Sequence, residues 1–230
     1  MKICTFNIQN NYRFYDKEKS LVLYKFLKEN KVDVIGLQEV FCKCDNDLKK
    51  ILDNVYSMIG NYRFFSKILL KRINEKTPII TNCKVLSSNT YHMPHFPSFL
   101  KRVITHVVIE YKGRELSIYN THLEVKNLNV KKKQLDYIYK LLVNDKREKI
   151  VMGDFNLKTN NSVFLDFVDS LEKIGISRVP LDEKTLKLSR YSREIDHIFI
   201  SDGFKVKNKQ VIKDLEISDH YPVIVELEIR

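Results

Sequence analysis

The feature that most constrains how this chain can fold is a set of short apolar segments that each adjoin a polar cluster. The apolar segments 34–37, 117–119 and 150–153 are each followed directly by a polar cluster: Gln38-Glu39, Asn120-Thr121-His122 and Asp154-Phe155-Asn156. Two further clusters, Asp196-His197 and Ser218-Asp219-His220, come just before the apolar segments 198–200 and 221–225. Ionisable groups beside buried strands are costly unless they are paired or bind a metal. Each cluster alone is also typical of a turn or a helix cap. Five of them in one chain indicate a functional site held on rigid strand ends.

Segments typical of strands and helices alternate along the whole chain. The pattern predicts strands at residues 2–8, 32–37, 84–91, 103–111, 115–121, 149–152, 195–200 and 221–228, with weaker candidates at 63–65 and 79–80. It predicts helices at residues 17–29, 47–59, 130–142 and 162–171. The turn Lys112-Gly113-Arg114 predicts a hairpin. Hairpins mixed with strand–helix–strand units indicate an α/β protein with more than one sheet, and nothing divides residues 1–230 into more than one domain.

The charge balance leaves two interpretations open. Lys and Arg total 40 against 29 Asp and Glu, a formal net charge of +11. A basic protein is attracted to polyanions such as nucleic acid or anionic lipid headgroups, but a lysine-rich solvated surface has the same composition.

Cysteine content and apolar patterning bear on the compartment. Cys4, Cys42, Cys44 and Cys83 do not make a zinc motif or a disulfide framework, which suggests reduced thiols. No apolar run reaches the ~18 residues of a membrane span, and no signal peptide is visible. We therefore expect a cytoplasmic protein.

The polar clusters suit metal-assisted phosphoryl transfer. Mg²⁺ prefers oxygen ligands and keeps several waters, so Asn7, Glu39 and Asp219 are candidate ligands. Asp154 is a candidate for the carboxylate that orients or deprotonates an attacking water. The side chains of Asn156 and His122 are candidates for holding the phosphate oxygens as charge builds.

A second pair of residues completes the predicted chemistry. Asp196 can fix the orientation of His220 and favour its cationic form. Other hydrolase classes lack support, because the sequence has neither a Cys/His zinc motif nor a Gly-rich phosphate loop, and no Gly-x-Ser-x-Gly elbow.

Six ordered motifs carry a resemblance to a known family. They are Thr5-Phe6-Asn7-Ile8, the segment 33–40 with Leu37-Gln38-Glu39, Asn120-Thr121-His122-Leu123, Gly153-Asp154-Phe155-Asn156, Ile195-Asp196-His197-Ile198-Phe199, and Ser218-Asp219-His220-Tyr221-Pro222-Val223. Together they resemble the endonuclease/exonuclease/phosphatase superfamily of metal-dependent phosphoesterases. The resemblance implies a four-layer α/β sandwich, with two packed mixed β-sheets flanked by helices. It also implies Mg²⁺ or Mn²⁺ and in-line attack of water on a phosphoester.

The resemblance also implies a role for each motif residue. Glu39 and Asn7 would bind the metal, with Asp219 near it, and Asp154 would activate the water. Asn156 and His122 would contact the phosphate, and His220, paired with Asp196, would stabilise it. The family's arginine near the Ile-Asp motif is displaced by one position here, to Arg193.

Fold and motifs indicate chemistry but not substrate. We expect nucleic acid, because phosphate contacts dominate such binding and the chain is basic; Arg102 and Arg193 are candidate backbone contacts, and Tyr191 a candidate for stacking on a base. A phosphoinositide or another small or lipid phosphoester is the alternative. A non-catalytic binding module is a third alternative, which the presence of Glu39, Asp154 and His220 disfavours. No obligate protein partner is implied.

Overall fold

The computed structural model describes residues 1–10, 16–52, 55–60, 76–97, 101–187 and 193–230. Twelve strands among these residues form two six-stranded sheets. The first sheet contains, in spatial order, β11 (Phe204–Val211), β12 (Val223–Ile229), β1 (Lys2–Asn10), β2 (Val34–Val40), β4 (Ile79–Thr81) and β3 (Ser57–Ile59). The second contains β5 (Lys84–His92), β6 (Val103–Tyr111), β7 (Arg114–His122), β8 (Glu148–Asp154), β10 (Asp196–Ser201) and β9 (Ile176–Arg178).

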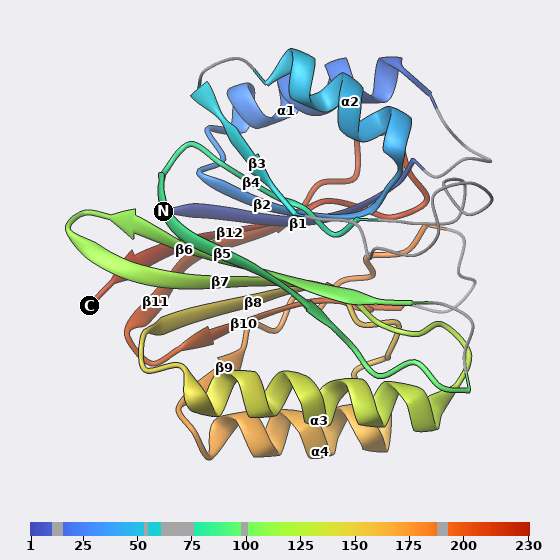
Figure 1. Cartoon of the computed structure of the whole chain (residues 1–230), viewed down its shortest axis with the longest axis vertical. Coiled ribbons are helices and arrows are strands. Elements are labelled where there is room, and N and C mark those ends of the chain that lie inside the picture. Colours follow the sequence, from blue (N-terminus) through green and yellow to red (C-terminus); the bar gives the residue numbers. More distant parts are fainter. Residues whose placement is uncertain (11–15, 53–54, 61–75, 98–100, 188–192) are drawn as a thin grey trace.

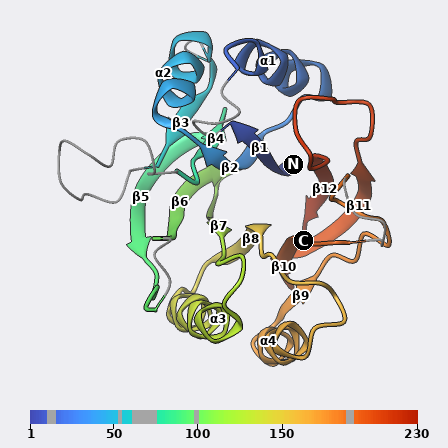
Figure 2. The same ribbon diagram turned by 90° about the vertical axis from the view of Figure 1, so that its right-hand side faces the viewer.

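Both sheets are mixed, and the four helices in the described part of the chain cover their outer faces. The pairs β1–β2 and β7–β8 are parallel, and the other paired strands are antiparallel. Helices α1 (Glu18–Asn30) and α2 (Cys42–Ile51) lie on the first sheet, and α3 (Leu128–Asn144) and α4 (Ser162–Glu172) lie on the second (Figures 1 and 2). The predicted four-layer α/β sandwich is confirmed. No helix in the described part of the chain is long and apolar enough to cross a membrane.

Among the residues that the structure describes, three apolar clusters hold the four layers together. One fills the space between the sheets and includes Ile3, Val107 and Ile150. The second joins α1 and α2 to the first sheet, and the third joins α3 and α4 to the second sheet. Burying one such side chain contributes roughly 1.5–3 kcal/mol, so the sheets form a rigid support for the residues at their edges.

Local sequence explains several boundaries. Helices α3 and α4 each begin after an asparagine, Asn127 or Asn161, whose side chain accepts hydrogen bonds from backbone N–H groups of the first turn. The predicted hairpin joins β6 to β7, and its turn residues Lys112 and Gly113 both have positive φ, of 51° and 76°. Such a turn matches the twist of the paired strands.

One predicted helix is wrong in its position. The pattern predicted a helix at residues 47–59, whereas α2 spans Cys42–Ile51 and Ser57–Ile59 forms strand β3. The helical stripe begins at Cys44 and continues through Leu48, and both side chains are buried against the first sheet. Strands β9 and β11 were also not predicted, and the weak strand candidate at residues 63–65 lies outside the described residues.

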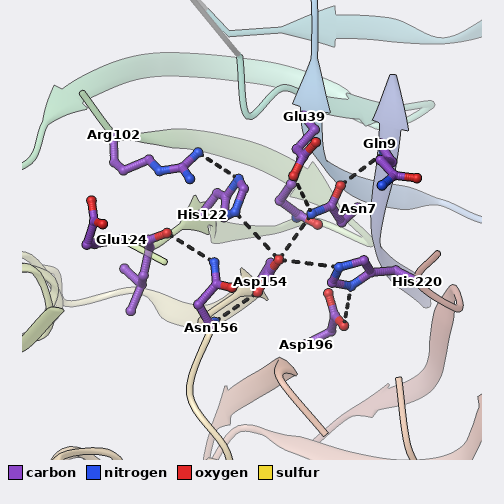
Figure 3. Close-up of polar contacts among 12 residues, drawn as sticks. Asn7, Gln9, Glu39, Arg102, His122, Glu124, Asp154, Asn156, Asp196 and His220 are labelled. Atoms are coloured by element: carbon purple, nitrogen blue, oxygen red, sulfur yellow. Dashed lines mark hydrogen bonds and ion pairs between the residues drawn. The ribbon is translucent and has the colours of Figure 1, made fainter. Parts of the chain in front are cut away.

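The strand order brings the polar clusters together. The parallel pairs place Asn7 beside Gln38 on the first sheet and His122 beside Asp154 on the second. Asp196 begins β10 opposite Asp154 in the antiparallel pair. The predicted site therefore lies where the ends of these strands meet, at one edge of both sheets (Figure 3).

Candidate active site

Asp154 is the centre of the site. Its carboxylate is buried at the end of β8, with 1% of the residue exposed. Its Oδ2 accepts a hydrogen bond from Asn7 Nδ2 at 3.1 Å, and it lies 3.5 Å from His122 Nε2 and 3.7 Å from His220 Nε2 (Figure 3). Three segments far apart in the sequence thus converge on one oxygen atom.

A short turn of the same kind orients Asn7 near the end of β1 and Asp154 at the end of β8. On the first sheet Asn7 Oδ1 accepts from the Gln9 backbone N–H at 3.0 Å, and on the second Asp154 Oδ1 accepts from the Asn156 N–H at 2.8 Å. Gln9 and Asn156 both adopt left-handed backbone, with φ of 45° and 52°. Because Asn7 Oδ1 is used in the turn, its Nδ2 faces the carboxylates and also donates to Glu39 Oε1 at 3.3 Å.

His220 is held against a second buried carboxylate. Its Nδ1 lies 2.9 Å from Asp196 Oδ2, and Thr185 Oγ1 accepts from the backbone N–H of Asp196 at 3.2 Å. Burial lowers the pKa of His220, but the carboxylates of Asp196 and, to a smaller extent, Asp154 and Asp219 together outweigh burial, and the pKa rises to about 10. At neutral pH the pair is therefore an imidazolium beside a carboxylate.

Asp154 is ionised at neutral pH despite its burial. Burial raises the pKa of its carboxyl group, while His122, His220 and the hydrogen bonds from Asn7 and Asn156 lower it, and the net shift is downward. The pKa of Asp196, the partner of His220, is by contrast raised, because burial outweighs its contacts with His220 and Thr185. Asp154 thus presents a carboxylate that can accept a proton.

The remaining predicted phosphate contacts lie on the opposite side of Asp154 from His220. His122 ends β7, and its Nδ1 is 2.9 Å from a guanidinium nitrogen of Arg102 (Figure 3). Arg102, predicted as a substrate contact, is only 5% exposed. The Asn156 side chain donates to the backbone carbonyl of Leu123 at 3.2 Å, so the turn after Asp154 is tied to the segment after His122.

The oxygen atoms at this edge suit a hard divalent cation. Glu39, half-buried at the end of β2, offers a carboxylate, an oxygen ligand of the type Mg²⁺ prefers. The predicted ligand Asn7 lies beside it, but Asn7 turns Nδ2 and not its oxygen toward this carboxylate. Asp154, Asp196 and His220 also form a candidate metal group, with one ligand atom from each within 4.8 Å of the others. The hydrogen bond between Asp196 and His220 competes with a metal for one of those atoms.

The other predicted site residues are less closely connected to this cluster. Asp219 precedes His220, and its backbone carbonyl accepts from Lys187 N–H at 2.7 Å. Within the described residues no hydrogen bond joins the Arg193 side chain to the cluster, and its carbonyl accepts from Thr185 N–H at 2.9 Å. Tyr191 lies outside the described residues.

The sequence did not single out two lysines that lie at the site. The sequence run Lys131-Lys132-Lys133 is by itself interpreted as a solvated helix face, but Lys131 is 6% exposed and its Nζ donates to the Asn156 carbonyl at 2.7 Å. That interpretation was wrong for Lys131, which lies on the buried face of α3; its spacing of four residues from Leu135 was the available signal. Lys19 Nζ donates to the Gln9 carbonyl at 3.3 Å.

The fold and the site together define a class of protein. Two face-to-face mixed sheets bear carboxylate, amide and imidazole groups at one edge, which suits phosphoester hydrolysis with a divalent metal. The family model for the endonuclease/exonuclease/phosphatase family matches residues 4–220, and the chain belongs to this family. A search of curated protein sequences found no match.

Solved structures with the same fold cover nearly the whole chain. A mannosyl-6-phosphatase from Bacteroides thetaiotaomicron is 20% identical, with a TM-score of 0.82 and coverage of 100% of both chains. The human nocturnin catalytic domain is 18% identical, with a TM-score of 0.77 and coverage of 100% of this chain and 93% of that one. D. rerio TDP2, solved with a single-strand DNA product, is 18% identical, with a TM-score of 0.76 and coverage of 99% and 98%. These similarities support the fold assignment.

Proposed function

We propose that this protein is a Mg²⁺- or Mn²⁺-dependent phosphodiesterase that hydrolyses nucleic acid. The observation that carries the hydrolytic part is the convergence of Asn7, His122 and His220 on one oxygen of the buried, ionised Asp154. The observation that supports a polyanionic substrate is the net charge of +11. Glu39 would hold the metal, with Asp219 near it, and Asn7 would add its Oδ1 as a ligand only by releasing the Gln9 N–H.

In this proposal Asp154 accepts the proton of the attacking water. Asn7 keeps the carboxylate oriented through its 3.1 Å hydrogen bond, and burial of Asp154 excludes bulk water from it. A positioned base of this kind contributes roughly 10²–10⁴-fold to a hydrolysis rate. The bound metal would supply Lewis-acid stabilisation of the phosphoryl oxygens.

The groups on the two sides of Asp154 would bind the phosphate. The His220 imidazolium, kept charged by Asp196, would stabilise negative charge on the non-bridging oxygens. On the other side the Nε2 of His122 and the amide of Asn156 would act as hydrogen-bond donors. The Asn156 amide nitrogen donates one N–H to the Leu123 carbonyl, which leaves its second N–H for a phosphate oxygen.

A small phosphomonoester is the second candidate substrate. The end-to-end structural match with a mannosyl-6-phosphatase favours it. Arg102, predicted as a nucleic-acid contact, is also buried against His122 instead of exposed for a long substrate.

Hydrolysis assays distinguish the two candidates. Supercoiled plasmid, labelled single- and double-stranded oligonucleotides and a panel of sugar phosphates would each be incubated with Mg²⁺, Mn²⁺ or EDTA. We expect cleavage of the nucleic acids that EDTA abolishes and that restored metal recovers. Release of phosphate from sugar phosphates with intact nucleic acids would replace the first candidate with the second. No metal-dependent hydrolysis of any of them would contradict the proposal.

A further inference from the structure

We propose that Arg102 is a positioning residue that holds His122 in a single tautomer, with its proton on Nε2. His122 then presents only a hydrogen-bond donor to the site. This inference rests on the proposed function for its consequence in catalysis. The tautomer itself follows from the hydrogen bonding of the two side chains.

The contact between the two side chains has only one possible direction. An arginine guanidinium has five N–H donors and no acceptor. Its terminal nitrogen lies 2.9 Å from His122 Nδ1, so Nδ1 must be the acceptor and must carry no proton. In an imidazole with a bare Nδ1, the proton is on Nε2. A doubly protonated ring would oppose two donors and two cations at this distance.

The backbone keeps both partners in place. Arg102 immediately precedes β6, His122 ends β7, and the two strands are paired with Ile104 opposite Thr121. The Arg102 carbonyl also accepts from Met93 N–H at 3.1 Å. With 5% and 1% of the two residues exposed, water has little access to compete for the contact. The arginine therefore faces the same ring nitrogen throughout.

The consequence lies at the other ring nitrogen. His122 Nε2 is 3.5 Å from Asp154 Oδ2 (Figure 3), and the proposed function places a phosphate oxygen beside it. With a proton there, His122 can donate to Asp154 or to a phosphate oxygen that enters beside it. It has no lone pair at Nε2 with which to take a proton from water. The arrangement therefore leaves Asp154 as the proton acceptor and makes His122 a fixed donor.

Two substitutions separate this role from simple packing. Arg102→Gln places an amide near Nδ1 that can accept as well as donate, so the tautomer is no longer imposed. Arg102→Lys keeps a donor without an acceptor and preserves it. The matched control is Arg114→Gln, which removes an exposed arginine from the start of β7.

Nitrogen chemical shifts of the imidazoles give a readout that does not depend on activity. In protein labelled with ¹⁵N-histidine, the His122 signals would be assigned from their loss in His122→Gln. We expect a protonated Nε2 in the wild type, Arg102→Lys and Arg114→Gln, and a partly or fully protonated Nδ1 in Arg102→Gln. We also expect kcat to fall by about 10²-fold in Arg102→Gln, with a smaller fall in Arg102→Lys.

The outcomes separate this proposal from the proposed function. A wild-type His122 protonated at Nδ1, or an unchanged tautomer in Arg102→Gln, would overturn the positioning role even in an active enzyme. Equal losses of kcat in the Gln and Lys variants would also overturn it, because Arg102 would then act by size alone. Spectra as expected in a protein without phosphoesterase activity would support the tautomer and refute the function.

Discussion

The two histidines beside Asp154 are held by partners of opposite charge. His220 Nδ1 meets the Asp196 carboxylate at 2.9 Å, and His122 Nδ1 meets the Arg102 guanidinium at the same distance. Both rings turn Nε2 toward the same oxygen of Asp154. One ring thus carries a positive charge, and the contact with Arg102 keeps the other a neutral donor.

This difference shows that the partner on Nδ1, and not the residue type, decides what each ring can do. A carboxylate accepts the Nδ1 proton and stabilises the imidazolium, whereas a guanidinium can only donate to a bare Nδ1. A site with two imidazolium groups would bind phosphate tightly but place three cations, Arg102 included, around one carboxylate. The mixed arrangement provides one charge and one neutral donor.

The largest effect is expected from substituting Asp154, the carboxylate that lies between His122 and His220. Asp154→Asn should lower kcat by about 10³-fold, because an amide cannot accept the proton of the attacking water. The measurement is the rate of metal-dependent hydrolysis, with the melting temperature as the control for folding. A variant that folds and keeps the wild-type rate would show that Asp154 is not the base, and that the two histidines converge on it for another reason.

The next largest effect is expected from removing the carboxylate that holds His220, without a change at His122. Asp196→Asn should lower kcat by about 10²-fold, because His220 loses the carboxylate that orients it and favours its cation. In metal-free protein, NMR titration should show the pKa of His220 falling from about 10 toward the ordinary range. The tautomer of His122 should not change. A His220 pKa that stays near 10 would mean that Asp154, and not Asp196, maintains the charge.

The sequence predicted the residues of this site better than their partners. Alternating segments predicted an α/β protein with more than one sheet, and the family resemblance carried by the polar motifs implied the four-layer sandwich. Asn7, His122, Asp154, Asp196 and His220 do lie together. Partners depend on which strands are neighbours, and the sequence does not state this directly. The predicted hairpin does pair β6 with β7, but Arg102 lies before β6, and the pairing alone does not show that its side chain contacts His122. Helix α2 was misplaced because its buried stripe begins at a cysteine.

Polar residues at strand ends also serve a structural purpose that the sequence could not separate from catalysis. Asn120 Nδ2 donates to the carbonyls of Leu37 and Pro78 at 2.8 and 2.9 Å, and its Oδ1 accepts from Gln38 Nε2 at 2.7 Å. The two sheets approach closely here, since a Cβ on Gly36 would lie 2.6 Å from the Asn120 side chain. These fully buried groups join the sheets beside the site.

A smaller effect is expected from substituting Lys131, which holds the turn at Asn156 on the same side of Asp154 as His122. Lys131→Met should lower kcat by about tenfold, because the 2.7 Å hydrogen bond from Nζ fixes the Asn156 carbonyl in the turn that follows Asp154. The matched control is Lys132→Met, which removes the neighbouring exposed lysine. Steady-state kinetics of the two variants give the comparison. Equal rates in both would indicate that Lys131 contributes charge or stability without positioning Asn156.

The smallest effect on activity is expected for a substitution of Asp145, which lies beside a third histidine, His106, away from the site. His106 stacks on Tyr119 at 4.2 Å, and burial lowers its pKa, while the nearby Asp145 raises it. Burial raises the pKa of Asp145, but hydrogen bonds from Ser117, the Arg147 backbone and Tyr119 outweigh it and make the net shift downward. Burial nevertheless outweighs this carboxylate at His106, whose net pKa shift is downward, so the ring is neutral at pH 7 without a donor-only partner such as Arg102.

Asp145→Asn should change stability without changing catalysis. A carboxyl whose pKa is lowered by folding stabilises the protein above its unfolded pKa of about 4, and this contribution disappears as pH falls through the folded pKa. The wild type should therefore melt at a higher temperature than the variant near pH 7, and the difference should narrow as the pH is lowered toward 2. The kcat at neutral pH should stay within about twofold, as for a change away from the site. A shift in the His122 tautomer in this variant would show that Arg102 does not control that ring alone, because Asp145 touches neither residue.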